Sequence, residues 1–226
     1  MNGQYVSGLD VHQLTFSMIG RERWQREGRV SMTPGRGAPG GEQGEDARII
    51  RTRADVARTA FDVLVQEGSD ALTHAHVAQR AGYSKTTLYK HWPTRFDLAA
   101  IALEALGEVE HHVPTGDLRT DLIGELTTFR QAVLDHRLDQ VLSAMTQWAT
   151  DDVMKEVRDK INTDGQRTIR GILEGAFGGA QLEAAISMLS GVVACPSLMF
   201  GTVPDDDVIE AAVDMVLRNV RRTAGR

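Results

Sequence analysis

Apolar residues recur at spacings of three and four along most of the chain between residues 47 and 220. Because an α-helix turns once about every 3.6 residues, this spacing places the apolar side chains on one side of each helix. No stretch alternates apolar and polar residues between hairpin turns, as the strands of a sheet would. The pattern predicts an all-α fold of about nine helices, with approximate bounds 53–67, 73–81, 84–91, 94–111, 118–133, 138–148, 151–177, 181–200 and 205–220.

Signals for helix ends are densest between residues 73 and 98. Asp97 lies three positions after a possible cap and can hold the exposed N–H groups of that helix. Gly82 permits the left-handed backbone that lets two short helices meet at a steep angle. The stretch predicts a short helix, a tight turn, a second short helix and a third helix start, with side-chain caps at Thr73, Ser84 and Thr94.

The exposed side of the two short helices carries hydroxyls, cations and an aromatic ring but no acidic residue. A surface of this kind suits the phosphate-lined major groove of DNA. In such a helix pair, residues near the start of the second helix reach base edges and flanking residues hold phosphates. We expect base contacts from Lys85, Thr86 and Tyr89, although the Tyr89 hydroxyl could instead reach a phosphate. The expected phosphate contacts are Thr87, Lys90, His91 and Arg95, with Thr73 at the edge of the same surface.

Residues 47–106 resemble the DNA-binding domain of the TetR/AcrR family of bacterial transcriptional repressors. The resemblance rests on the helix Arg53–Glu67, on the run from Ser84 to His91, and on the Pro-Thr-Arg sequence that follows. It implies that the residues just named contact DNA, and that the last two long helices pair across a homodimer as a four-helix bundle. Trp92 stands where the family commonly has Phe, and we expect it to pack between helices.

Charge is distributed unevenly along the 226 residues, whose formal net charge is −6. Residues 47–97 hold 8 Lys and Arg against 5 Asp and Glu, whereas residues 98–226 hold 12 against 20. A basic region on an acidic chain favours DNA binding through that region alone. A Gly- and Pro-rich stretch indicates that residues 1–46 form a disordered extension. We therefore expect this extension, a helix-turn-helix DNA-binding domain at 47–97, and a helical ligand-binding and dimerisation domain at 98–226.

One helix-turn-helix reads too few base pairs for useful specificity, so we expect a two-fold homodimer on a palindromic DNA site. A stripe of small residues, spaced four apart, begins at Ser187. Large apolar residues flank this stripe, and in a monomer they would form an exposed patch of the kind found at interfaces. A helix buried in the centre of a monomer is the alternative interpretation. The predicted dimer interface consists of Ser187, Met188, Gly191, Val192, Cys195 and Met215.

The helices after residue 98 are expected to enclose a pocket for a small effector. Flexible Met side chains together with large aromatic rings suit an apolar or aromatic ligand. His111 and His112 are adjacent, would point in different directions on a helix and have no third partner at a fixed spacing, so no metal site is predicted. The ligand candidates are Leu126, Phe129, Met145, Trp148 and Met154, each of which also suits ordinary core packing.

The remaining features bear on location and on the class of protein. No G-x-S-x-G, phosphate-loop or H-E-x-x-H motif is present. The single cysteine, Cys195, excludes an internal disulfide framework and fits a reducing cytoplasm. The uncharged stretch 184–204 is long enough to span a bilayer, but its Gly, Pro, Ser and Thr residues favour a buried helix.

Taken together, these features predict a cytoplasmic homodimeric repressor without a cofactor or membrane contact, which a small apolar or aromatic effector releases from double-stranded DNA. A DNA-binding protein controlled by a protein partner is the alternative, and an all-α enzyme is the least favoured.

Overall fold

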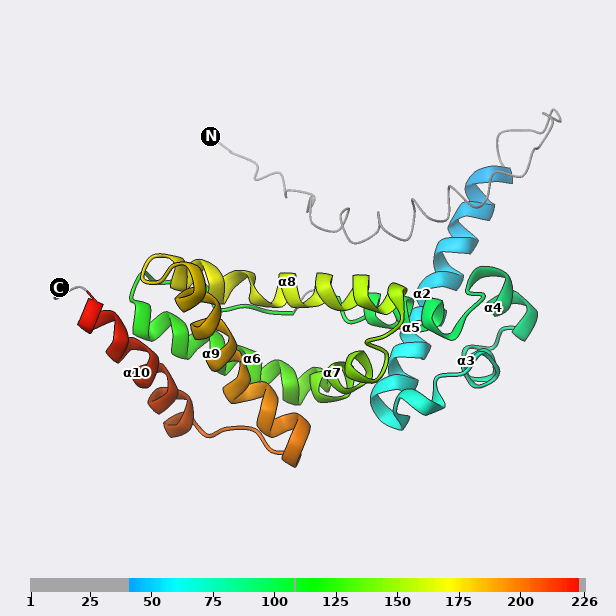
Figure 1. Cartoon of the computed structure of the whole chain (residues 1–226). Helices are drawn as coiled ribbons and strands as arrows, with labels where there is room; N and C mark the ends of the chain where they lie inside the picture. The colour runs from blue at the N-terminus through cyan, green and yellow to red at the C-terminus, as the bar shows by residue number, and fades with distance from the viewer. Residues whose placement is uncertain (1–40, 108, 224–226) are drawn as a thin grey trace, which may run out of the picture. The chain divides into compact units, whose positions relative to one another are not determined.

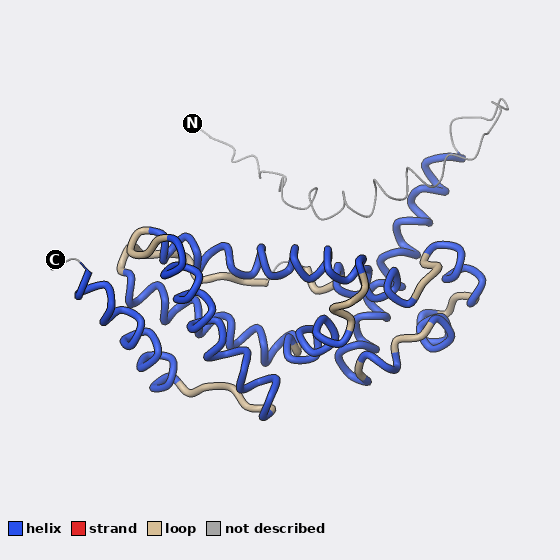
Figure 2. The backbone as a smooth tube through the Cα atoms, in the orientation of Figure 1, coloured by secondary structure: helices blue, strands red, loops and turns tan. Residues whose placement is uncertain are grey.

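The computed structural model describes the backbone of residues 41–107 and 109–223, and the side chains of residues 49–107 and 109–218. Within these ranges all regular structure is helical, with nine α-helices, a short 3₁₀ helix and no strand, which confirms the predicted all-α fold (Figure 2). Residues up to Arg51 belong to one unit and the chain from Thr52 onward to another. Every contact given below lies within the second unit.

The helices follow one another along the chain, and the segment between α5 and α6 is the longest connection among the described helices (Figure 1). Their bounds are α2 (Gly41–Glu67), the 3₁₀ helix η1 (Ser69–Ala71), α3 (His74–Ala81), α4 (Lys85–His91), α5 (Arg95–Glu104), α6 (Leu118–His136), α7 (Leu138–Gln147), α8 (Asp152–Glu174), α9 (Gly179–Phe200) and α10 (Asp206–Thr223).

The start of α2 differs from the predicted end of the disordered extension at residue 46. The helix already begins at Gly41. The rest of the predicted extension, residues 1–40, lies outside the described residues.

The helix-turn-helix has the predicted caps. The Thr73 side chain accepts a hydrogen bond from the His76 N–H, and Ser84 accepts one from the Thr87 N–H at 3.0 Å. Thr94 and Asp97 form a reciprocal capping box at the start of α5. Gly82, with a φ of 74°, takes the left-handed conformation between α3 and α4. Local sequence alone therefore accounts for the starts of these three helices and for the end of α3.

Buried apolar side chains from α2 through α10 form one continuous core. Trp92 belongs to it, which confirms its packing role. Helix α6 is central, because it contacts α7, α8, α9 and α10, and α5 packs against α8. The predicted domain boundary between residues 97 and 98 falls inside α5, so the two regions share a helix. The division at that point stays a prediction.

The predicted helix 94–111 is too long, because α5 ends at Glu104. Gly107 has a φ of 70°, a left-handed conformation that does not continue a helix. Residues 109–117, called the strap below, are not helical and lead to α6. The prediction failed because apolar spacing continues past Glu104, whereas the backbone groups of the strap are bound by side chains of α6.

Two buried carboxylates on α6 hold the strap. Asp121, which is 3% exposed, accepts hydrogen bonds from the Thr115 N–H at 2.7 Å, the Gly116 N–H at 2.9 Å and His112 Nε2 at 3.1 Å, as well as from the Thr115 hydroxyl. Glu125, 4% exposed, accepts from the His112 N–H at 2.9 Å and lies 2.7 Å from His111 Nδ1. The hydrogen bonds to Asp121, foremost the one from the Thr115 N–H, hold the pKa of Asp121 well below its ordinary value.

The His112 ring also covers Gly124, one turn further along α6. A Cβ added at Gly124 would lie 2.5 Å from His112 Nδ1, and Asp121 keeps that ring in place. A helical glycine at this position therefore makes room for the strap. It contrasts with Gly165 in α8, where an added Cβ meets no atom within 4 Å.

These two glycines make a matched pair of substitutions. We expect Gly124→Ala to lower the free energy of unfolding by about 1–2 kcal/mol, because overpacking costs more than the better helix propensity of Ala returns. Gly165→Ala should instead raise it by about 0.5–1 kcal/mol. Urea unfolding followed by circular dichroism, at one fixed protein concentration, measures both. Equal effects at the two sites would contradict the close packing of His112 on Gly124.

Candidate nucleic-acid interface

Helices α3 and α4 pack together through fully buried Val77 and Leu88. This packing turns the other side of α4 outward. The structure leaves Lys85, Thr86, Tyr89 and Lys90 exposed and Thr87 and His91 half-buried, while Thr73 is exposed at the start of α3. Seven of the eight residues predicted to contact DNA therefore have side chains that reach the surface at this helix pair.

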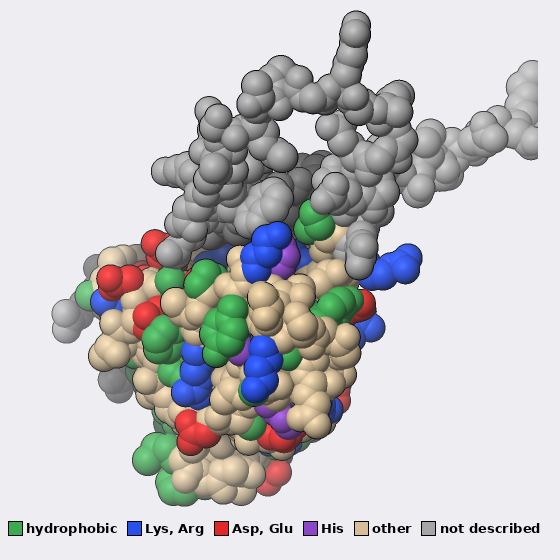
Figure 3. All heavy atoms as spheres, turned by 90° about the vertical axis from the view of Figure 1, so that its right-hand side faces the viewer, with side chains coloured by type: hydrophobic (Ala, Val, Ile, Leu, Met, Phe, Trp, Pro, Cys, Tyr) green, Lys and Arg blue, Asp and Glu red, His purple; other side chains and the backbone are tan. Residues whose placement is uncertain are grey.

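The charge of this surface suits DNA. No Asp or Glu occurs from Thr73 to Thr94, a range that includes Lys85 and Lys90. Figure 3 looks onto this end of the molecule, where Lys and Arg side chains are spread over the face and most acidic side chains lie toward its edge. Such a face lowers the cost of approach to phosphates, since it presents no negative charge at its centre.

Tyr89 is held from beneath by a residue that the sequence reasoning did not select. Its ring, with the residue 53% exposed, stacks on buried His74 with a centroid separation of 4.1 Å and an interplanar angle of 11°. His74 Nε2 lies 2.6 Å from the Trp92 carbonyl oxygen, which it can reach only as a donor. The imidazole is thus fixed at one edge and presents a flat face to Tyr89. No local pattern signals this, because the two residues belong to different helices.

Two of the predicted phosphate contacts have features that sequence did not indicate. Burial lowers the pKa of His91, and the neighbouring charge of Lys90 lowers it further, so a neutral imidazole is favoured near neutral pH. Arg95 is half-buried and turned inward. Its guanidinium donates to the Ser69 carbonyl oxygen, lies 3.6 Å from Asp70 and covers the ring of Trp148. Its contact with phosphate stays a prediction, and its visible partners are internal.

Basic groups of α3 are likewise occupied. His76 and Arg80 both pair with Glu67 at the end of α2, with His76 Nε2 at 2.9 Å. The hydrogen bond from His76, followed by that from Arg80, lowers the pKa of Glu67. The exposed cations that remain on the helix-turn-helix are therefore those of α4, Lys85 and Lys90.

Trp148, at the end of α7, joins this region to the other helices. Its ring meets Phe96 edge-on with a centroid separation of 6.3 Å. Arg95, in the first turn of α5, lies 5.5 Å from the centroid of the same ring. The adjacent Gln147 accepts a hydrogen bond from the Ser69 hydroxyl at 2.5 Å. These contacts attach both η1 and the start of α5 to the end of α7.

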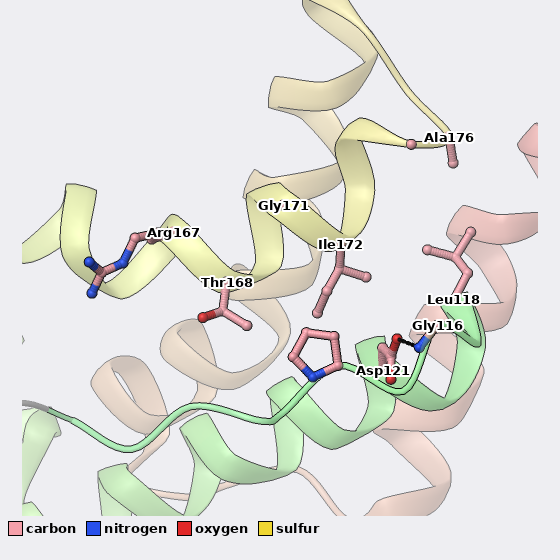
Figure 4. A pocket seen from close by; sticks show the side chains of 10 residues that line it. Gly116, Leu118, Asp121, Arg167, Thr168, Gly171, Ile172 and Ala176 are labelled. Atoms are coloured by element: carbon pink, nitrogen blue, oxygen red, sulfur yellow. Dashed lines mark hydrogen bonds between the residues drawn. The ribbon is translucent and has the colours of Figure 1, made fainter. Parts of the chain in front are cut away.

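The predicted ligand residues are mostly part of the closed core. Four of them are buried and one, Phe129, is half-buried. None lines the cavity of about 540 Å³ that lies between the strap, the start of α6 and the last turns of α8 (Figure 4). That cavity is lined by Pro114, Gly116, Leu118, Asp121, Arg167, Thr168, Gly171, Ile172, Gly175 and Ala176. A direct role for the five predicted residues in ligand binding stays a prediction.

The predicted dimer surface lies on the outer side of α9 and on α10. Helix α9 buries Leu189 and Val193 against its neighbours. The other side is open, with Met188 58% and Met199 72% exposed. All six residues predicted for the interface are exposed or half-buried. Helix α9 is also long and apolar enough to cross a membrane by length and composition alone, and a third of its most apolar window is buried.

The comparison with known proteins points to a single family. The model for bacterial regulatory proteins of the tetR family matches residues 56–101, which contain α3 and α4. An uncharacterised HTH-type transcriptional regulator of Mycobacterium tuberculosis is 29% identical over 174 residues, 72% of this chain and 85% of the relative. The class A tetracycline repressor protein from transposon 1721 of Escherichia coli is 41% identical over 86 residues, 36% of this chain and 40% of that protein.

Solved structures agree with this comparison. The TetR family transcription regulator SCO0332 matches with a TM-score of 0.55 and 26% identity over 74% of this chain and 97% of its own. A tetR-family transcriptional regulator from Streptomyces coelicolor, at 17% identity, shares the fold with a TM-score of 0.60 over 78% of this chain and 89% of its own. Residues 56–101 of this chain thus match the family model for tetR-family bacterial regulatory proteins, and the chain resembles transcriptional regulators, a TetR-family structure among them, over about three quarters of its length.

Proposed function

We propose that this regulator is a cytoplasmic repressor that binds a palindromic operator as a homodimer and leaves it when a small effector binds. The observation that carries the proposal is the acid-free outer face of α4, with exposed Lys85, Tyr89 and Lys90 inside the range that the family model matches. A relative over this part of the chain is named a tetracycline repressor, which supports repression as the mode of action.

In this proposal α4 enters the major groove. Lys85 and Thr86, in its first turn, contact base edges, and Tyr89 contacts a thymine methyl group or a phosphate. Thr87, Lys90 and His91 hold the backbone. Because His91 favours the neutral form, its contribution is a hydrogen bond to a phosphate oxygen, and the electrostatic part of the affinity comes from the lysines.

Dimerisation is supported by the open side of α9. Apolar side chains there would remain in water in a monomer, which is unusual for a patch of this kind. The small residues Ser187 and Gly191 allow a second copy of the helix to approach closely. We propose that this side of α9, together with Met215 on α10, packs against its copy rather than against lipid, because the opposite side of α9 already forms protein core.

Effector release requires that the ligand prefer one spacing of the two α4 helices over another. The contacts of Trp148 with Arg95 and Phe96 support a route for this preference. A displacement of the end of α7 would move the first turn of α5. This turn follows α4, the reading helix, which in this proposal contacts the bases.

Loss of Lys85 tests the placement of the reading face. On a duplex that the wild-type chain selects from a random-sequence library, we expect Lys85→Ala to bind about tenfold to a hundredfold more weakly, because a base contact is lost. Lys155→Ala, which removes the same charge from α8, should change the affinity little. A fluorescence anisotropy titration measures both, and equal losses would show that only the net charge matters.

The stack of His74 on Tyr89 should contribute to the same affinity. Both His74→Leu and His74→Phe lose the hydrogen bond to the Trp92 carbonyl, but only Phe keeps an aromatic face. We expect the Leu variant to bind DNA more weakly than the Phe variant by about 0.5–1.5 kcal/mol. In a Tyr89→Ala background this difference should vanish. A difference that persisted there would mean that His74 acts on the fold and not through Tyr89.

The dimer surface can be tested with a charge. A glutamate at Met188 would be buried without a partner, a cost of about 3 kcal/mol or more, so Met188→Glu should shift the protein toward monomers and weaken DNA binding. Leu134→Glu places the same charge at a residue of α6 that is 51% exposed and should leave the dimer intact. Sedimentation velocity distinguishes the species. A dimeric Met188→Glu variant would place the interface elsewhere.

A further inference from the structure

The cavity beside α8 has walls of very different character. One wall is α8, a regular helix that presents Thr168 and Ile172 toward the side where Asp121 lies (Figure 4). The opposite wall is the strap, whose backbone is held by side-chain acceptors instead of helical hydrogen bonds. The volume of the cavity, about 540 Å³, lies within the range of roughly 300–1,000 Å³ that small-molecule sites occupy.

Of the two charged residues that line the cavity, only one has its charge available to a ligand. Asp121 is buried and already accepts four hydrogen bonds from the strap, so it has little capacity for another donor. Arg167 is exposed and forms no ion pair or hydrogen bond among the described residues. Arg167 lines the margin of the cavity, and in Figure 4 its guanidinium points away from the other lining side chains. The uncommitted charge at this cavity is therefore positive.

We propose that this cavity binds a small organic acid, with its anionic group paired to Arg167 and its apolar body between Ile172 and the strap. Guanidinium groups bind carboxylates and related anions through paired hydrogen bonds, and Leu118 and Pro114 supply apolar surface. As an effector site, the cavity rests on the function proposed above. The effector would then be an organic acid, and its site would differ from the buried core around Met145 and Trp148.

The position of the strap gives the site a connection to the DNA-binding region. The strap follows α5, the helix that begins beside the reading helix and packs against α8. A ligand lodged between strap and α8 therefore contacts both the segment that follows α5 and the helix against which α5 rests. Its binding energy can favour one arrangement of these elements over another.

The test uses glycines of α8 that differ in one respect. Gly171 lines the cavity, whereas Gly165 does not, and an added Cβ meets no atom within 4 Å at either position. Gly171→Leu should fill the cavity and Gly165→Leu should not, while leucine favours the helix at both. The probe is anilinonaphthalene sulfonate, an apolar organic anion that fluoresces when it is removed from water. Each variant is examined as the full chain, with circular dichroism as a check on folding.

We expect Gly171→Leu and Arg167→Ala each to weaken binding of the dye at least about tenfold, and Gly165→Leu to match the wild type. Arg167→Lys, which keeps the charge, should recover part of the affinity. Wild-type affinity in Gly171→Leu would overturn the proposal, since the dye would then occupy another surface, such as the open side of α9. DNA binding by the same variants is measured separately. A variant that binds DNA normally but not the dye supports the cavity as a ligand site. A wild-type chain that fails to bind DNA contradicts the proposed function, and the dye result then decides only whether the cavity binds an organic acid.

Discussion

The packing of Trp148 against Arg95 and Phe96 attaches the start of α5, the helix that follows α3 and α4, to the end of α7. An aromatic ring with a cation on its face and a second ring at its edge has a preferred geometry, so this contact constrains direction as well as distance. The Gln147–Ser69 hydrogen bond adds a second point of attachment.

The strap shows the opposite kind of constraint. Its backbone has no regular partner of its own, and acceptors on α6 replace the helical hydrogen bonds that it lacks. Burial of Asp121 and Glu125 is tolerated because every carboxylate oxygen in contact with the strap meets a donor. The same arrangement explains why α6 carries a glycine at residue 124, where any side chain would displace His112.

Sequence reasoning succeeded where the cause of structure is local. Thr73, Ser84, Thr94 and Gly82 act within one turn of themselves, so the bounds of α3, α4 and the start of α5 could be predicted. The end of α5 could not, because acceptors on α6 decide the conformation of the strap. The stacking of His74 on Tyr89 and the inward turn of Arg95 are likewise contacts between elements. The cavity was missed for the same reason, since most of its lining residues are glycine or carry no distinctive pattern.

The way in which the strap is anchored has a consequence for how this regulator can change over evolutionary time. Three of the groups that bind it to α6 are backbone N–H groups, those of residues 112, 115 and 116. Val113 and Pro114 lie between them and supply no hydrogen bond to that attachment. Of the two, Pro114 lines the cavity, so a substitution there can reshape that wall while the anchor persists. In the effector site proposed above, the molecule that is recognised can thus diverge between descendants without a new fold.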